Sequence, residues 1–115
     1  ARKKLRPAYR WSFTQWDVLL APNNLLGPFP HINAPWPERW LDVNGTKVQY
    51  GLQNVYAAVA TLCGQPATSF PVSLNKSGLP IGLQAIGPYL EDKTTIRFAE
   101  LIEAEFGGFH PPPGY

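Results

Sequence analysis

The sequence predicts an α/β fold in which a mixed sheet is covered by helices. Its 115 residues are 44% apolar and 16% charged, which is typical of a folded domain. Apolar side chains recur at helical spacing in three stretches, while "IGLQAIG" is apolar on both alternating faces, as in a strand covered on two sides. We expect the order helix, strand, loop, hairpin, helix, strand, strand, helix.

The first predicted helix spans residues 2–16 and carries one apolar stripe. Pro7 falls either near its first turn or at a kink. The basic residues between the stripe positions are interpreted as a solvated helix face, so we expect no nucleic-acid partner. The stripe is Leu5, Tyr9, Phe13 and Trp16, and the basic residues are Arg2, Lys3, Lys4, Arg6 and Arg10.

A strand, a long loop and a hairpin follow the first helix. Residues 18–20 are consecutive and apolar and are closed by Pro22, which predicts a short strand buried on both faces. Residues 23–40 hold four prolines without periodicity and predict a packed loop. Within 41–50, Asn44-Gly45 predicts a type I′ turn between two short strands.

The second half alternates helix and strand. Apolar spacing predicts a helix over residues 52–63, ended by Gly64. Residues 67–74 and 81–88 are two predicted strands joined by a turn. A last helix is expected over residues 93–106, with Asp92 as its N-cap and Gly107-Gly108 after it. Three helices and a hairpin barely cover such a sheet, so a partner segment is expected to be missing.

The sequence lacks the residue spacings that a nucleophilic catalytic site or a metal site would need. Ser73 and Lys76 match Ser-x-x-Lys, but a strand running into a turn would not hold them one helical turn apart. The two histidines and Cys63 lack the spacing of a metal site, so we expect no metal and no cofactor. Cys63 is expected to be a small core residue, while Gln65, if buried, needs a hydrogen-bonding partner.

No apolar run reaches membrane-spanning length, and the basic amino-terminal end is not followed by the apolar core of a secretion signal. A single cysteine fits a reducing compartment. We therefore expect a cytoplasmic protein without a membrane span. The chain does not begin with Met and lacks an initial helix cap, which favours a piece of a longer protein.

Several stretches in order carry a family resemblance: "WDVLLAP", "VNGTKVQY", "CGQPATSFPVSLNKSGLPIGLQAIGPYLEDKTT" and "GGFHPPPGY". They resemble the carboxy-terminal part of an amidase-signature hydrolase. The resemblance implies hydrolysis of carboxamides through a serine nucleophile, a second serine and a lysine base, all in the amino-terminal part of the family. Residues 1–115 would then be incomplete and inactive alone, with that amino-terminal part and a small-molecule amide as partners and 107–115 as a Gly/Pro-rich tail.

The resemblance also suggests four substrate-pocket candidates and no catalytic residue in this chain. The loop after the first strand would border the pocket mouth through Asn23, Asn24 and Leu25. Asn54 stands about where amidotransferase members carry an acidic residue that holds an ammonium group. A neutral amide argues against an ammonium-bearing substrate, since it cannot offer the charge-assisted bond.

The ending Pro112-Pro113-Gly114-Tyr115 leaves an alternative open. Its Pro-Pro-x-Tyr spacing suits a WW-type partner, which would make the chain a non-catalytic interaction module. On the amidase interpretation the tail is a polyproline strap anchored by Phe109, with the packing of Tyr115 left open. Exposed sheet faces and edges would also allow a homo-oligomer.

Overall fold

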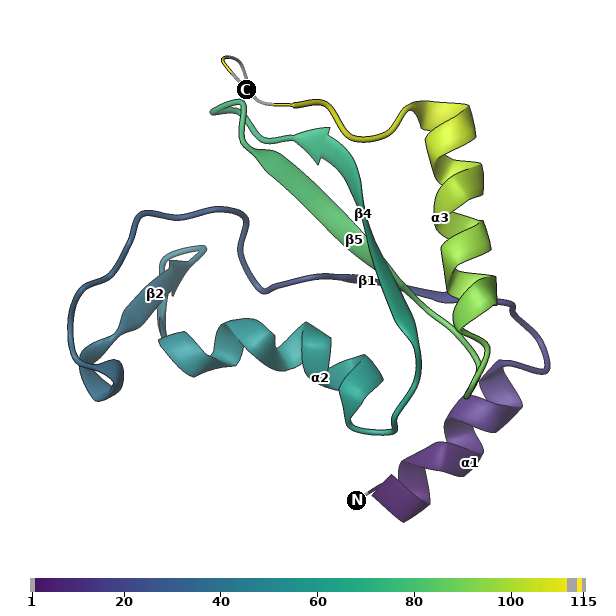
Figure 1. Cartoon of the computed structure of the whole chain (residues 1–115). Coiled ribbons are helices and arrows are strands. Elements are labelled where there is room, and N and C mark those ends of the chain that lie inside the picture. The colour runs from purple at the N-terminus through teal and green to yellow at the C-terminus, as the bar shows by residue number, and fades with distance from the viewer. Residues whose placement is uncertain (1, 112–113, 115) are drawn as a thin grey trace.

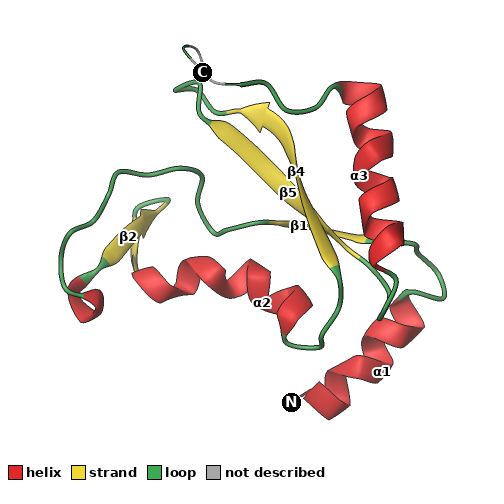
Figure 2. Ribbon diagram, viewed as in Figure 1, coloured by secondary structure: helices red, strands yellow, loops and turns green. Residues whose placement is uncertain are grey.

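The computed structural model describes residues 2–111 and 114 of the chain, and it contains the mixed helix-and-sheet arrangement that the sequence predicts (Figures 1 and 2). The helices and strands, in chain order, are α1 Arg2–Ser12, β1 Leu19–Pro22, η1 Trp36–Glu38, β2 Trp40–Val43, β3 Thr46–Gln49, η2 Tyr50–Asn54, α2 Val55–Thr61, β4 Ala67–Leu74, β5 Pro80–Ile86 and α3 Asp92–Phe106.

Three strands form the main sheet in the order β1-β5-β4, and both pairings are antiparallel. Gln84 lies opposite Ala21 on β1 and Ser69 on β4, so these three side chains share one face. The next residue, Ala85, lies opposite Thr68 and therefore faces the other way. β2 and β3 make a separate two-stranded hairpin.

Helix α3 covers one face of the sheet, while α2 lies on the opposite side (Figures 1 and 2). The hydroxyls of Thr68 and Thr95 are hydrogen-bonded at 2.8 Å, and the rings of Phe70 and Phe98 lie 6.0 Å apart. A Cβ atom on Gly87 would come within 2.6 Å of the Thr95 Cγ2 atom, so glycine at this position allows the close approach of α3.

The core is small and is centred on β5. Ala85 and Ile86 are fully buried, and Cys63 is 1% exposed, which confirms that it is a core residue. The prediction that the first strand is buried on both faces is wrong for this chain, because Leu19 and Leu20 are 40% and 48% exposed. β1 is an edge strand that pairs only with β5 among the described residues.

The first and second helices differ from their predicted bounds. α1 ends at Ser12 rather than at residue 16, because the next turn tightens to an i to i−3 bond from Thr14 N to Trp11 O. Of the predicted apolar stripe, Tyr9 and Phe13 are half-buried, whereas Leu5 is exposed and Trp16 is 71% exposed. The helix predicted over 52–63 begins as the 3₁₀ turn η2 and is α-helical only over Val55–Thr61.

The turn and cap predictions are confirmed at three positions and corrected at one. Asn44 and Gly45 have φ angles of 53° and 83°, as a type I′ turn requires. Gly64 and Gly107 also have positive φ and end their helices. Asp92 is wrong as the N-cap of α3, because it is the first helical residue and Glu91 occupies the cap position.

The tail differs from the expected strap as far as it is described. Phe109 is 74% exposed, so it does not anchor the segment by burial. Pro112, Pro113 and Tyr115 lie outside the described residues, and with them most of the Pro-Pro-x-Tyr motif. The strap and the WW-type ligand therefore lack structural support.

Candidate functional site

The loop after β1 lies against the turn that opens α2, and this contact joins the predicted pocket residues. The backbone N–H of Leu25 donates a hydrogen bond to the carbonyl of Gln53 at 3.2 Å. Leu25 is itself a candidate, and Gln53 precedes the candidate Asn54. The structure thus brings together two segments that lie about thirty residues apart in the sequence.

Gln84 makes a second connection at the same junction. Its side chain is 5% exposed and projects from β5. The Nε2 atom donates to the carbonyl of Pro22, at the end of β1, and to the carbonyl of Tyr56, in the first turn of α2, both at 2.9 Å. This buried amide therefore links three elements around the start of the loop.

Asn23 is the most constrained of the four candidates. It is half-buried, and its Oδ1 atom accepts a 3.2 Å hydrogen bond from the Ser69 hydroxyl. Its Nδ2 atom lies where a Cβ atom on Gly82 would be only 2.7 Å away, so the glycine leaves room for this side chain. Asn23 therefore lies across the sheet rather than pointing freely into solvent.

Asn24 and Asn54 are exposed, while Leu25 is half-buried. Asn54 occupies the cap position of α2 without making a side-chain cap bond. Its amide is consequently available to a ligand, although the helix would favour its use as a cap. Asn23, Asn24, Leu25 and Asn54 form one neighbourhood, and their role in a pocket stays a prediction.

Residues 23–54, here called the arm, extend from this junction and carry an aromatic cluster. The Tyr50 ring makes edge contacts with Phe29 at 6.0 Å and with Trp36 at 5.2 Å. The Arg39 guanidinium lies over the rings of Trp36 and Tyr50, and its Nε atom donates to the carbonyl of Ala34 at 2.6 Å. These contacts hold the proline-rich loop against the hairpin.

The described residues do not assemble a catalytic pair from Ser73 and Lys76. Ser73 lies in β4, and its hydroxyl donates to the carbonyl of Leu74, whereas Lys76 lies in the following turn. Residues of a strand and a turn do not present their side chains one helical turn apart. Within residues 2–111 and 114, no group of three or more metal-ligating side chains comes together either.

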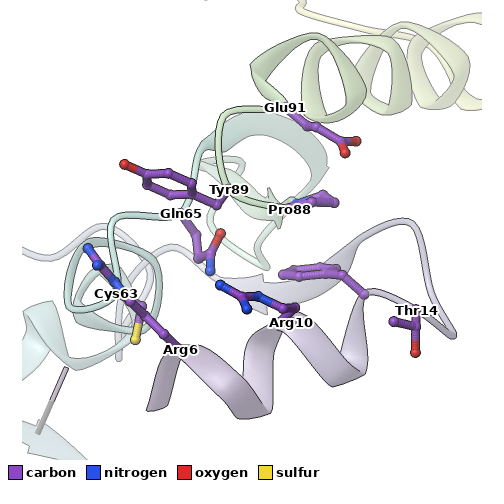
Figure 3. Close-up of a pocket in the computed structure, with 9 residues that line it drawn as sticks. Arg6, Arg10, Thr14, Cys63, Gln65, Pro88, Tyr89 and Glu91 are labelled. Atoms are coloured by element: carbon purple, nitrogen blue, oxygen red, sulfur yellow. The ribbon is translucent and has the colours of Figure 1, made fainter. Parts of the chain in front are cut away.

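A separate cavity of about 460 Å³ lies between α1 and the segments 63–65 and 88–91 (Figure 3). Arg6 and Arg10 extend toward it from α1, while Gln65 and Glu91 come from the other wall. The Gln65 Oε1 atom is buried without a hydrogen-bonding partner among the described residues. The cavity lies apart from the four pocket candidates, because none of them lines it.

α1 reaches the rest of the molecule through a few polar contacts beside this cavity. The Tyr9 hydroxyl donates to the carbonyl of Val59 at 2.7 Å, and Arg6 lies over the Tyr89 ring. Burial raises the pKa of the Tyr9 hydroxyl, and the neighbouring Cys63 raises it further.

None of the described helices is both long and apolar enough to cross a membrane.

Comparison with known families decides the affiliation of the chain. The sequence profile of the family named Amidase matches residues 1–96. The chain belongs to the amidase family. This confirms the resemblance that the sequence motifs indicate.

Curated relatives of this amidase-family chain are much longer than it is. It is 32% identical over 104 residues to an A subunit of the glutamyl-tRNA(Gln) amidotransferase of Clostridium acetobutylicum. The alignment covers 90% of this chain and 20% of that protein. It is 32% identical over 112 residues to the corresponding A subunit of Alkaliphilus metalliredigens, in an alignment that covers 97% of this chain and 21% of the relative. The chain therefore spans about a fifth of the length of these relatives.

Solved structures support the same assignment. The A subunit of the glutamyl-tRNA(Gln) amidotransferase of Thermotoga maritima matches with a TM-score of 0.76 and 27% identity, over 97% of this chain and 23% of that one. A bacterial aryl acylamidase of the amidase-signature family matches with a TM-score of 0.68 and 25% identity, over 92% of this chain and 21% of that one. The fold is that of one portion of a larger amidase-signature enzyme.

The sequence alone does not place Gln84 or Ser69 in this neighbourhood. One signal was present, because Gln84 is a lone polar residue inside the otherwise apolar "IGLQAIG" strand. A polar side chain in such a strand requires partners when it is buried. Its partners could not be named from the sequence, since they are backbone carbonyls of distant elements.

Proposed function

We propose that this chain completes the sheet and forms part of the substrate-pocket wall of an amidase that hydrolyses carboxamides. The observation that carries the proposal is the family match over residues 1–96, in a chain about a fifth as long as its relatives. On this view residues 1–115 are the carboxy-terminal part of the amidase domain, with 107–115 as a tail. The catalytic serines and lysine belong to the remainder of the enzyme.

The chemistry of the four candidates suits a neutral amide. Asparagine side chains can donate to a carbonyl oxygen and accept from an amide N–H, so the exposed Asn24 and Asn54 could orient both ends of a carboxamide. Asn23, whose Oδ1 atom accepts from Ser69, would support the wall from the sheet side. Leu25 offers an apolar contact to the rest of the substrate. The wall would thereby position the scissile bond for a nucleophile supplied from elsewhere in the enzyme.

A second candidate function is that of part of an amidotransferase, which the names of the curated relatives favour. A small amide such as glutamine carries an ammonium group that would need an acidic partner. Asn54 is neutral and exposed, and this favours substrates without a cationic group. The two candidates therefore differ in the charge of the small amide that the pocket accepts.

A steady-state assay separates these candidates. The longer protein that carries this segment is offered a panel of neutral aliphatic and aryl amides alongside glutamine, and the release of ammonia or of the corresponding amine is measured. We expect higher kcat/KM on a neutral amide than on glutamine. A preference for glutamine would support the amidotransferase candidate, and absence of turnover on every amide would contradict both.

The 115-residue chain is the matched control in the same assay, because it lacks the predicted nucleophile. We expect no turnover from it, and serine-type turnover by the chain alone would contradict the placement of catalysis elsewhere.

A cytoplasmic location and self-association belong to the same proposal. Light scattering on the longer protein tests self-association, and cell fractionation tests the location.

A further inference from the structure

Gln84 is a polar residue in the most deeply buried part of the sheet. Its neighbours Ala85 and Ile86 are fully buried, and Gln84 itself is 5% exposed. It shares a sheet face with Ser69, whose hydroxyl binds Asn23, while Ala85 and Thr68 belong to the opposite face covered by α3. A buried amide is costly unless it is hydrogen-bonded, so its partners indicate what it does.

Both N–H donors of Gln84 are used, and they reach segments that are remote in sequence. Pro22 lies 62 residues away and ends β1, and Tyr56 lies 28 residues away in the first turn of α2. Each Nε2 to carbonyl distance is 2.9 Å, which is ideal for an N–H donor. Asn23 follows Pro22 directly, and Asn54 precedes Tyr56 by two residues.

We propose that Gln84 is a positioning residue for the substrate pocket. It holds the Asn23–Leu25 loop beside the Asn54 turn, because it binds the backbone just before the loop and just after the turn. The inference rests on the proposed function, since it assigns a role toward the same pocket wall. Gln84 touches no predicted substrate position itself. It acts through the two carbonyls that it binds.

The contact between the two segments would be weak without this amide. Within the described residues, the direct backbone link is the single 3.2 Å bond from Leu25 N to Gln53 O. One such bond contributes little net free energy against the entropy of a loop. Removing the Gln84 donors should therefore separate the two halves of the wall and leave the α3 face of the sheet unchanged.

The test compares two buried substitutions in the longer enzyme. Gln84→Met keeps the length of the side chain and removes both donors. Thr95→Val is the matched control, because Thr95 is 1% exposed and its hydroxyl bonds Thr68 and the carbonyl of Asp92 on the opposite face. Both variants lose buried hydrogen bonds, but only the first loses those beside the predicted pocket.

We expect Gln84→Met to raise KM for the preferred amide on the order of tenfold, with a smaller change in kcat, because the nucleophile lies outside this chain. Thr95→Val should lower the melting temperature and leave KM unchanged. Should Gln84→Met fail to fold, Gln84→Asn serves instead, since its shorter amide cannot span both carbonyls. It should raise KM in the same direction.

Hydrogen exchange provides a second readout that does not need turnover. In Gln84→Met the amide of Leu25 should lose protection, while the amide of Gly87, which donates to the carbonyl of Pro66, keeps it. Unchanged KM and unchanged Leu25 protection would overturn the proposal, and so would an equal KM rise in Thr95→Val. If the enzyme hydrolyses no amide, the proposed function fails, and exchange at Leu25 still decides whether Gln84 holds the loop.

Discussion

The β4–β5–α3 unit and the arm of residues 23–54 are held in place by different means. The unit is local in sequence and buries Phe70 and Ala85 on the α3 face of the sheet and Ile86 on the opposite face. In the arm, Leu41 is buried, but Trp36 and Trp40 are 53% and 44% exposed. Asn23 of the arm accepts a hydrogen bond from the Ser69 hydroxyl of the main sheet, and Gln84 binds the carbonyls of Pro22 and Tyr56, just outside the two ends of the arm.

The difference separates stability from position. Burial of apolar surface contributes most of the free energy of folding, and substitutions in the β4–β5–α3 unit should act on the whole molecule. Hydrogen bonds contribute less to the free energy of folding but fix geometry. Substitutions at the two ends of the arm should therefore act on its placement. α1 resembles the arm in this respect, because Tyr9 attaches it to α2 by a single hydroxyl.

The largest effect is expected at the centre of the unit. Ile86 is fully buried, and Ile86→Ala should lower the free energy of unfolding by about 3 to 4 kcal/mol through lost burial and the cavity left behind. Urea unfolding measures the change. Ile81→Ala on the same strand is the control, since Ile81 is 38% exposed and should cost about 1 kcal/mol. Equal losses at both positions would remove the contrast between buried and exposed ends of β5.

A smaller loss is expected where α3 approaches the sheet. In Gly87→Ala the added Cβ would lie 2.6 Å from the Thr95 Cγ2 atom, and we expect a loss of about 2 kcal/mol from overpacking. The double variant Gly87→Ala/Thr95→Ser removes that methyl group and keeps the hydroxyl, so it should recover most of the loss. A double variant as unstable as Gly87→Ala would show that the contact is not the cause.

The attachment of α1 should depend on one proton. Tyr9→Phe removes the donor to the Val59 carbonyl and should cost about 1 kcal/mol near neutral pH. The pKa of Tyr9 is raised in the folded state from its ordinary value of 10.0, so its stabilising contribution is present below pH 10 and is lost as the pH rises through the folded pKa.

The stability difference between the natural protein and Tyr9→Phe should therefore shrink above pH 10. Thermal unfolding at pH 7 and at pH 10.5 measures it. Tyr50→Phe is a comparison at another half-buried tyrosine for which no hydroxyl hydrogen bond is seen among the described residues. If the Tyr9 difference stays constant across this range, the hydroxyl does not attach α1 in its neutral form.

The smallest effect on the whole molecule is expected in the arm. Gly45 has a φ angle of 83° and nothing within 4 Å of an added Cβ, so Gly45→Ala strains the hairpin turn by about 1 kcal/mol without a clash. Amides of β3 should exchange faster, while the main sheet keeps its protection. Gly27→Ala is the matched control in the same arm, because its Cβ also meets nothing and its φ is not left-handed. Faster exchange in the main sheet would show that the arm and the unit unfold together.

Local signals in the sequence predict much of this fold. Asn44-Gly45 locates the hairpin, and Gly64 and Gly107 locate two helix ends. Glycine and asparagine adopt positive φ more readily than other residues, and all four have positive φ in the structure. The Asp92 cap is wrong by one residue, since carboxylates favour both the cap and the first turn. Errors of this kind move a boundary and leave the element in place.

Properties that depend on distant parts were harder to predict. Burial of β1 was expected from its apolar run, yet a strand is covered only if other layers are present, and the described residues leave Leu19 and Leu20 exposed. The proximity of the Asn23 loop to Asn54 came from family resemblance. The link through Gln84 could not be derived, because backbone carbonyls carry no sequence signature.

The strand order β1-β5-β4 has a consequence for the speed of folding. β4 and β5 are joined by a short turn and can pair early, whereas β1 must find β5 across a long stretch of chain, with Gln84 and Pro22 separated by 62 residues. Closing such a loop is entropically slow compared with closing a hairpin. We therefore expect the mouth of the predicted pocket to be the last region of this chain to acquire its native shape.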